Sequence, residues 1–226
     1  MKRLVVGIWS LVAISNFVAQ FCGAGYNDAI DRIQQEASLL QGDQERLVMV
    51  GSSSFRFWPQ TDTVFAHYEV VNAGFGGSCF EDLWRLRGPL IYALQPNVLL
   101  VYEGDNDLFD GVPEPLILDA ASRLLQELAQ KLPATRLVVV APKASPARYH
   151  LSKGYLSLNA KLKSLVEEQG ATWVDFWSAQ HNQDGALRDD LFLSDQLHLN
   201  RKGYAVWVES LRKQVPWLDP NKKVRD

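Results

Sequence analysis

Residues 47–51 read LVMVG, an unbroken apolar run that ends in a glycine and leads into three serines. Continuous runs rich in Val and Leu are typical of strands that are buried on both faces, as in a parallel sheet. Four further runs of similar character follow along the chain, at residues 68–73, 97–103, 136–141 and 171–176. The sequence therefore predicts five short strands in a parallel sheet.

Segments with helical periodicity surround these runs. Apolar residues recur at helical spacing in residues 27–41, 80–94, 116–132, 156–168 and 202–215. Because helix and strand alternate, we expect an α/β fold of three layers with right-handed crossovers. The 226 residues of the chain are enough for one well-buried domain and few for two. A single domain over residues 26–226 is therefore expected.

The first 25 residues differ from the rest of the chain. Lys2 and Arg3 precede a largely apolar stretch at residues 4–21, and the small residues of the segment 22–25 follow it. This order is typical of a secretory signal peptide, here with cleavage after Ala24. An uncleaved anchor is the alternative, because residues 4–21 could just span a bilayer. We therefore expect a secreted or periplasmic protein, with a membrane tether only through residues 4–21.

Charge and histidine spacing give no support for several classes of partner. A net charge of −3 gives no reason to expect nucleic acid or an anionic membrane surface as a partner. The histidines show no spacing typical of metal ligands; they are His67, His150, His181 and His198. The sequence therefore predicts neither a metal nor another cofactor.

A polar or glycine-rich motif follows each predicted strand. In an open parallel sheet, ligands bind outside the carboxyl ends of the strands, so all five motifs should meet at one edge. The motifs are Gly51-Ser52-Ser53, Gly74-Phe75-Gly76-Gly77, Gly104-Asp105-Asn106-Asp107, Lys143-Ala144-Ser145-Pro146, and the loop that carries Asp195 and His198.

Together these motifs contain the groups that acyl transfer requires. Asp195 precedes His198 by three residues, so its carboxylate can hold one imidazole nitrogen while the other accepts a proton from Ser53. An oxyanion would be bound by three donors: the backbone N–H groups of Ser53 and Gly77, and the side-chain amide of Asn106. The sequence thus predicts a serine nucleophile, a histidine base and an orienting aspartate.

Four blocks of sequence resemble those of the SGNH hydrolases, also called GDSL-type esterases or lipases. The blocks are MVGSSSFRFW at residues 49–58, NAGFGGS at 72–78, GDND at 104–107 and DQLHLN at 195–200. The branch with a Trp five residues after the nucleophile matches Trp58, which selects Ser53 over Ser52 and Ser54. Residues 102–104 and 143–148 also look like one bacterial subgroup, and the resemblance runs from about residue 30 to residue 211.

The resemblance implies a flavodoxin-like sandwich and cleavage of a carboxylic ester through an acyl-serine intermediate, with no cofactor. Its substrate would be a small-molecule or carbohydrate ester. A carbohydrate O-deacetylase or an O-acetyltransferase would use the same groups with a different acceptor. One departure is Ser52, which replaces the loop-bracing Asp of Gly-Asp-Ser.

Other interpretations remain for the whole protein and for single residues. The protein could be an inert binding module on the same fold. Ser53, taken alone, could be a helix N-cap. Asp107 is expected to brace its own loop through backbone N–H groups. Arg148 and Tyr149 could line the substrate cleft or lie on an ordinary surface.

Overall fold

The computed structural model describes residues 26–218 apart from residues 41 and 43. Its five strands are all parallel and have the order β2-β1-β3-β4-β5, which is that of flavodoxin-like folds. The strands are β1 (Arg46–Gly51), β2 (Glu69–Gly74), β3 (Val98–Tyr102), β4 (Arg136–Val140) and β5 (Thr172–Val174). The predicted fold class is confirmed. The predicted signal peptide or anchor lies outside the described residues.

All five helices expected from periodicity are present. They are α2 (Asn27–Ser38), α5 (Phe80–Leu90), α7 (Glu114–Lys131), α8 (Ser152–Glu168) and α9 (Arg201–Gln214). The predicted helix at residues 80–94 is interrupted, because Pro89 has no backbone N–H to donate and α5 ends at Leu90. A separate 3-10 helix, η1 (Tyr92–Leu94), completes this segment.

Several short elements are not among those predicted from periodicity. Three are helices of one turn: α3 (Ser53–Arg56), α4 (Thr61–Val64) and α6 (Asp105–Phe109). The others are the 3-10 helices η2 (Pro146–Leu151), η3 (Ser178–Gln180), η4 (Asp189–Leu191) and η5 (Pro216–Leu218). Most of them lie in the connections that follow the carboxyl ends of strands, where the polar motifs are.

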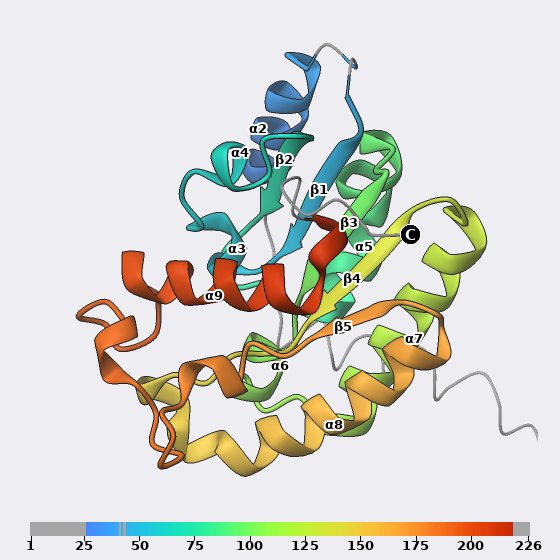
Figure 1. Cartoon of the computed structure of the whole chain (residues 1–226). Helices are drawn as coiled ribbons and strands as arrows, with labels where there is room; N and C mark the ends of the chain where they lie inside the picture. Colours follow the sequence, from blue (N-terminus) through green and yellow to red (C-terminus); the bar gives the residue numbers. More distant parts are fainter. Residues whose placement is uncertain (1–25, 41, 43, 219–226) are drawn as a thin grey trace, which may run out of the picture.

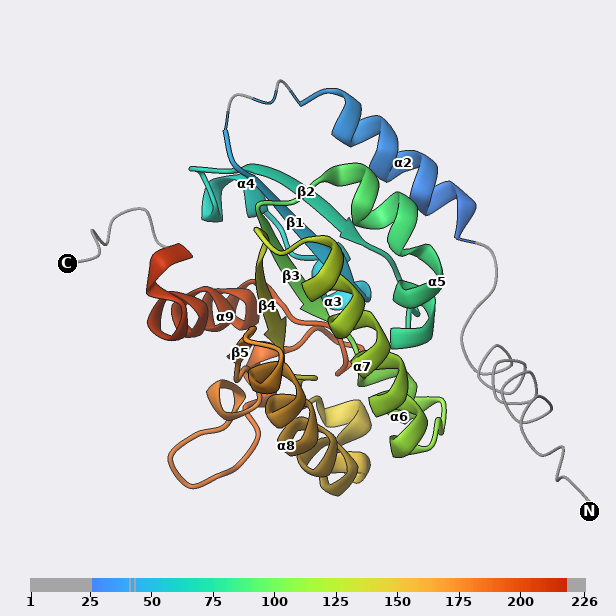
Figure 2. The ribbon, with the colours of Figure 1, turned by 90° about the vertical axis from the view of Figure 1, so that its right-hand side faces the viewer.

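Helices cover both faces of the sheet (Figures 1 and 2). On one face lie α2, α5, α7 and α8, and on the other lies α9. Side chains alternate along β1, so Val48 and Val50 join the core under the first group while Leu47 and Met49 pack on the α9 side. All four are fully buried. Burial on both faces explains why the strands read as unbroken apolar runs.

A close contact between backbones directs the chain after β1 across the edge of the sheet. Gly51 has φ +143°, and a Cβ there would lie 2.1 Å from the carbonyl oxygen of Tyr102. The N–H of Ser52 donates to that same oxygen at 3.2 Å. Only glycine allows this approach, which places α3 at the carboxyl edge beside the end of β3.

None of the helices in residues 26–218, leaving out 41 and 43, has the length and apolar character that crossing a bilayer requires.

Candidate active site

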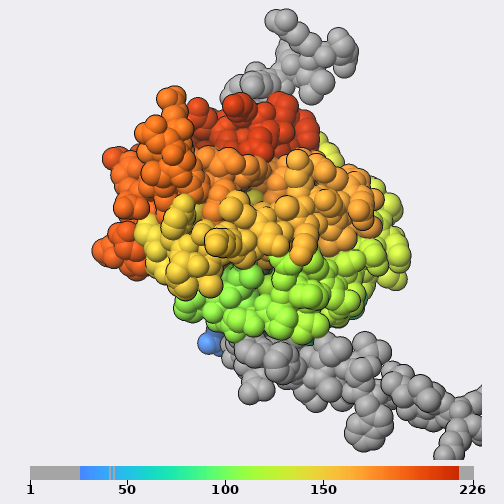
Figure 3. All heavy atoms as spheres, turned by 90° about the horizontal axis from the view of Figure 1, so that it is seen from below, coloured from blue at the N-terminus to red at the C-terminus, as the bar shows by residue number. Residues whose placement is uncertain are grey.

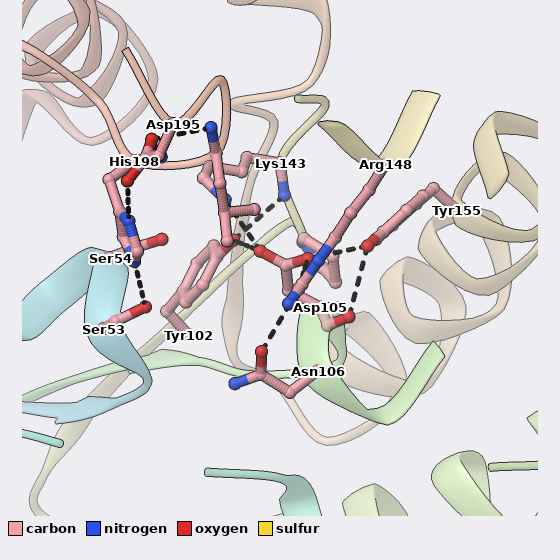
Figure 4. Close-up of polar contacts among 12 residues, drawn as sticks. Ser53, Ser54, Tyr102, Asp105, Asn106, Lys143, Arg148, Tyr155, Asp195 and His198 are labelled. Atoms are coloured by element: carbon pink, nitrogen blue, oxygen red, sulfur yellow. Dashed lines mark hydrogen bonds and ion pairs between the residues drawn. The ribbon is translucent and has the colours of Figure 1, made fainter. Parts of the chain in front are cut away.

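Three side chains from two distant segments form a continuous chain of hydrogen bonds at this edge (Figure 4). His198 Nε2 lies 3.0 Å from Ser53 Oγ, and His198 Nδ1 lies 2.7 Å from Asp195 Oδ2. A neutral imidazole that donates from Nδ1 to the carboxylate has a free lone pair on Nε2 for the serine hydroxyl. The three residues that the sequence singled out are therefore brought together.

The loop between Asp195 and His198 holds the carboxylate in place. Asp195 Oδ1 accepts the backbone N–H groups of Leu197 and His198, both at 2.9 Å, while Oδ2 faces the imidazole. Partial burial raises the pKa of Asp195, but these hydrogen bonds outweigh it and lower the pKa to about 2. Asp195 is therefore a carboxylate at neutral pH and can orient the imidazole.

Ser53 stands at the first position of α3. Its own N–H has no acceptor in a preceding helical turn and is therefore available to a ligand. Ser52 and Ser54 are both buried, whereas the Ser53 hydroxyl reaches His198. Sequence reasoning missed Phe57, which is 52% exposed and packs edge-on against His198 with ring centroids 5.1 Å apart.

Gly77 lies in the exposed turn that follows β2. Its φ of +78° is in the left-handed region that favours glycine, and a Cβ there would have open space around it. The N–H of Gly77 donates to no atom of the described residues. Gly74, three residues earlier, packs against α3: a Cβ there would lie 2.5 Å from the N atom of Arg56. The turn therefore presents an unused donor next to the segment that carries Ser53.

The side-chain amide of Asn106 has a defined orientation. Its Nδ2 donates one hydrogen to the carbonyl oxygen of Ser78 at 2.9 Å, and its Oδ1 accepts from Arg148 Nη1 at 3.1 Å. Figure 4 shows the amide nitrogen on the side that faces Ser53. One Nδ2 hydrogen therefore remains for a ligand.

A buried ionic cluster lies behind Asn106. Asp105 Oδ2 contacts Lys143 Nζ at 2.8 Å, and Oδ1 contacts Arg148 Nη1 at 2.6 Å. The hydroxyls of Tyr102 and Tyr155 also donate to the carboxylate, at 3.0 and 2.6 Å. Burial alone would raise the pKa of Asp105, but the charges of Lys143 and Arg148 hold it well below its usual range. Arg148 is therefore not an ordinary surface residue, because it is buried, with 7% exposure, and ion-paired.

Two further carboxyls support the loops around Asn106. Asp107 accepts the N–H groups of Phe80 at 3.2 Å and Gly104 at 3.1 Å, which confirms its expected bracing role. Burial raises the pKa of Asp107 to about 7. Glu103 accepts from Ser78 Oγ at 2.6 Å, and burial raises its pKa well above the usual range. In the described part of the chain, no group of His, Cys, Asp and Glu is arranged to hold a metal ion.

The fold and the position of these groups define an SGNH-type hydrolase. Residues 38–206 match the GDSL-like Lipase/Acylhydrolase family, and the chain belongs to this family. It is accordingly a hydrolase of ester bonds. One similar protein is the human platelet-activating factor acetylhydrolase IB subunit alpha2, which is 25% identical over 182 residues. That match covers 76% of this chain and 76% of the relative.

Solved structures share the fold. A GDSL-like lipase from Bacteroides thetaiotaomicron superposes with a TM-score of 0.70 at 16% identity, covering 84% of this chain and 97% of that one. An acetyl xylan esterase from Geobacillus stearothermophilus superposes with a TM-score of 0.63 at 16% identity, covering 80% and 97%. At these identities the likeness concerns the fold alone.

Proposed function

We propose that the protein is a serine esterase in which Ser53 is the nucleophile, His198 the general base and Asp195 the group that orients the base. The hydrogen-bond chain from Ser53 Oγ through the imidazole to Asp195 carries this proposal. Both distances are within the range at which a base activates a hydroxyl nucleophile.

Acylation begins when Ser53 Oγ attacks the carbonyl carbon of the ester. His198 Nε2 accepts the hydroxyl proton, and the Asp195 carboxylate stabilises the imidazolium that results. The carbonyl oxygen becomes an oxyanion that accepts hydrogen bonds from the N–H groups of Ser53 and Gly77 and from Asn106 Nδ2. Donors fixed in advance at the place where charge develops lower the barrier most effectively.

Acylation ends with His198 acting as an acid, and deacylation follows with water as the nucleophile. The tetrahedral intermediate collapses, the bond between carbon and the alcohol oxygen breaks, and the leaving oxygen takes the proton from His198. Water then attacks the acyl-serine ester while His198 accepts one of its protons. Collapse of the second intermediate releases the carboxylic acid and returns the proton to Ser53 Oγ.

The substrate class that we propose is an acetyl ester of a small molecule or a carbohydrate. The names of two similar proteins, an acetylhydrolase subunit and an acetyl xylan esterase, favour a short acyl group. A panel of nitrophenyl esters of rising acyl length, run beside acetylated xylo-oligosaccharides, tests this. The acetyl ester should have the highest kcat/KM, and a preference for long acyl chains would contradict it.

An acetyl acceptor other than water is the second outcome of the same chemistry. If a sugar hydroxyl replaces water in deacylation, the product is an acetylated sugar and the protein is an O-acetyltransferase. Supplying an oligosaccharide acceptor with nitrophenyl acetate separates the two. Release of acetate with no acetylated sugar supports the esterase.

Replacement of the nucleophile tests the proposal itself. Ser53→Ala should reduce hydrolysis of nitrophenyl acetate by about 10³-fold or more, because neither acylation nor an acyl-enzyme is then available. Ser54→Ala is the matched control, since Ser54 is the next residue of α3 and should keep nearly full turnover. Parental turnover in Ser53→Ala would overturn the assignment.

We also propose that the protein is exported. The support is the order of Lys2 and Arg3, the apolar residues 4–21 and the small residues that follow. Sequencing the N-terminus of protein recovered from the periplasm or medium of a bacterial host tests this. A mature protein that starts near Gly25 is expected, whereas protein retained in the cytoplasm would contradict export.

A further inference from the structure

Arg148 lies where three parts of the candidate site meet. It belongs to η2, the turn after β4, and the N–H of the preceding residue, Ala147, donates to the carbonyl oxygen of Gln196 at 3.0 Å in the loop of His198. Figure 3 shows the yellow segment of this region between the orange segment that follows β5 and the green segment that contains α6. The backbone beside Arg148 therefore contacts the histidine loop, while its guanidinium contacts Asn106.

One nitrogen of Arg148 bonds two successive residues of α6. Nη1 donates to Asp105 Oδ1 at 2.6 Å and to Asn106 Oδ1 at 3.1 Å (Figure 4). The guanidinium also packs against the ring of Phe109, with Cζ 4.1 Å from the ring centroid. Ion pair, hydrogen bond and ring contact together leave this buried side chain little freedom to move.

The donor-only chemistry of arginine selects one orientation of the Asn106 amide. A guanidinium cannot accept a hydrogen bond, so only the amide oxygen can face Arg148. If the amide turned by 180°, its NH₂ group would face the guanidinium, and the bond from Asn106 Nδ2 to the Ser78 carbonyl would be lost as well. Arg148 therefore keeps Nδ2 on the side of Ser53.

Arg148 also changes the electronic character of the amide. A charged donor on the amide oxygen polarises the group and makes its N–H a stronger donor, an effect that grows where the local dielectric is low. Only Arg148 contacts the amide, whereas the ammonium of Lys143 pairs with Asp105, so this polarisation comes from Arg148 and not from Lys143.

We propose that Arg148 is a positioning residue of the oxyanion hole, which orients and polarises the Asn106 amide so that it binds the transition state. This inference rests on the proposed function. It predicts an effect on kcat with little effect on KM, because the oxyanion exists only after the attack by Ser53.

The chain offers a matched control in Lys143. Both Lys143 and Arg148 pair with Asp105, but only Arg148 contacts Asn106. Arg148→Met should lower kcat for nitrophenyl acetate about 10- to 100-fold with KM changed less than about threefold. Lys143→Met should lower kcat less than about threefold, although both variants lose one cation from the same buried carboxylate. Equal losses of kcat in the two variants would overturn the inference.

A double-mutant cycle shows whether Arg148 acts through Asn106. If it does, Arg148→Met should change kcat less than about twofold in an Asn106→Ala background. Full additivity of the two losses would overturn the inference, as would an Asn106→Ala variant with parental kcat. Neither result bears on the assignment of Ser53 as the nucleophile, which parental turnover in Ser53→Ala would overturn.

Chemical rescue covers the case in which Arg148→Met does not fold. Arg148→Ala, checked by its thermal melt, should regain at least threefold in kcat with guanidinium chloride at tens of millimolar, and none with sodium chloride. Arg148→Lys supplies a single ammonium without the planar fork and should fall between parent and Arg148→Met. Absence of rescue in folded Arg148→Ala, together with parental kcat in Arg148→Lys, would contradict the inference.

Discussion

His198 Nε2 lies 3.0 Å from Ser53 Oγ, although the two residues are 145 positions apart in the chain. The contact exists because β1 and β5 run in the same direction, so the segments after both strands reach the same edge of the sheet. The local sequence around each residue does not by itself bring Ser53 and His198 together. The arrangement depends on the whole sheet, and the predictions below test its parts.

Removing the negative charge next to His198 should impair turnover without unfolding the protein. Asp195→Asn is expected to lower kcat by about 10²- to 10⁴-fold, because an amide no longer stabilises the imidazolium and favours the wrong tautomer. Asp190→Asn is the control, since Asp190 is a half-exposed carboxylate in the same connection. Steady-state kinetics with nitrophenyl acetate give kcat for both variants. Similar kcat values in the two would contradict the proposed role of Asp195.

Activity should fall in acid with a single protonation. An imidazolium cannot accept the Ser53 proton, so kcat/KM should drop about tenfold per pH unit on the acid side of the profile. Asp195, with its pKa lowered to about 2, remains ionised above pH 4 and adds no second step there. The measurement is kcat/KM between pH 4 and 8. A flat profile, or a slope of two, would contradict this account.

Stability should depend on pH through buried carboxyls with raised pKa values, among them Asp82, Asp107 and Glu103. Burial raises the pKa of Asp82 to about 6 and that of Asp107 to about 7. The folded state therefore keeps protons that the unfolded state releases, and the free energy of unfolding should decrease from pH 5 to pH 8, by on the order of 2–4 kcal/mol. Asp105 and Asp195 have lowered pKa values, so their contributions are lost only below about pH 4, outside this window.

Urea unfolding of variants at both pH values measures this dependence. Asp107→Asn should reduce the difference between pH 5 and pH 8, since an amide does not titrate. Asp62→Asn, at an exposed position in α4, should leave the difference as in the parent. Greater stability at pH 8 than at pH 5 in the parent would show that the sign is wrong.

The end of β1 should tolerate no side chain at position 51. Gly51→Ala would bring a Cβ within 2.1 Å of the Tyr102 carbonyl oxygen at a φ of +143°, so the expected loss is about 3 kcal/mol or more of unfolding free energy. Gly76→Ala is the control, because no described atom lies within 4 Å of its added Cβ, and should cost less than about 1 kcal/mol. Denaturant titration at fixed pH measures the loss of unfolding free energy in both variants. Equal losses in the two would contradict this prediction.

Hydrophobic patterning was sufficient to predict the strands and the long helices. Unbroken runs such as residues 47–51 occur because both faces of the sheet are covered, and periodic segments such as α7 occur because one face of each helix is buried. Placing the polar motifs after these strands then predicted that Ser53, Gly77, Asn106 and the Asp195–His198 loop would gather at one edge.

The parts that could not be predicted depend on contacts between distant residues. Helices of one turn, such as α3 and α6, are too short to show a periodicity. The burial of Arg148 depends on Asp105, 43 residues earlier, and no local pattern indicates that a charged side chain will find a buried partner. The contact of Phe57 with His198 likewise joins two segments whose proximity only the completed fold supplies.

Covalent labelling tests the central claim most directly, since the claim is that Ser53 is the nucleophile and His198 activates it. The protein is treated with a fluorophosphonate probe, and the modified residue is located by mass spectrometry of its peptides. We expect a single adduct on Ser53, no adduct in Ser53→Ala, and labelling slowed at least about 100-fold in His198→Ala. An adduct on Ser52 or Ser54, or undiminished labelling of Ser53→Ala, would contradict the account.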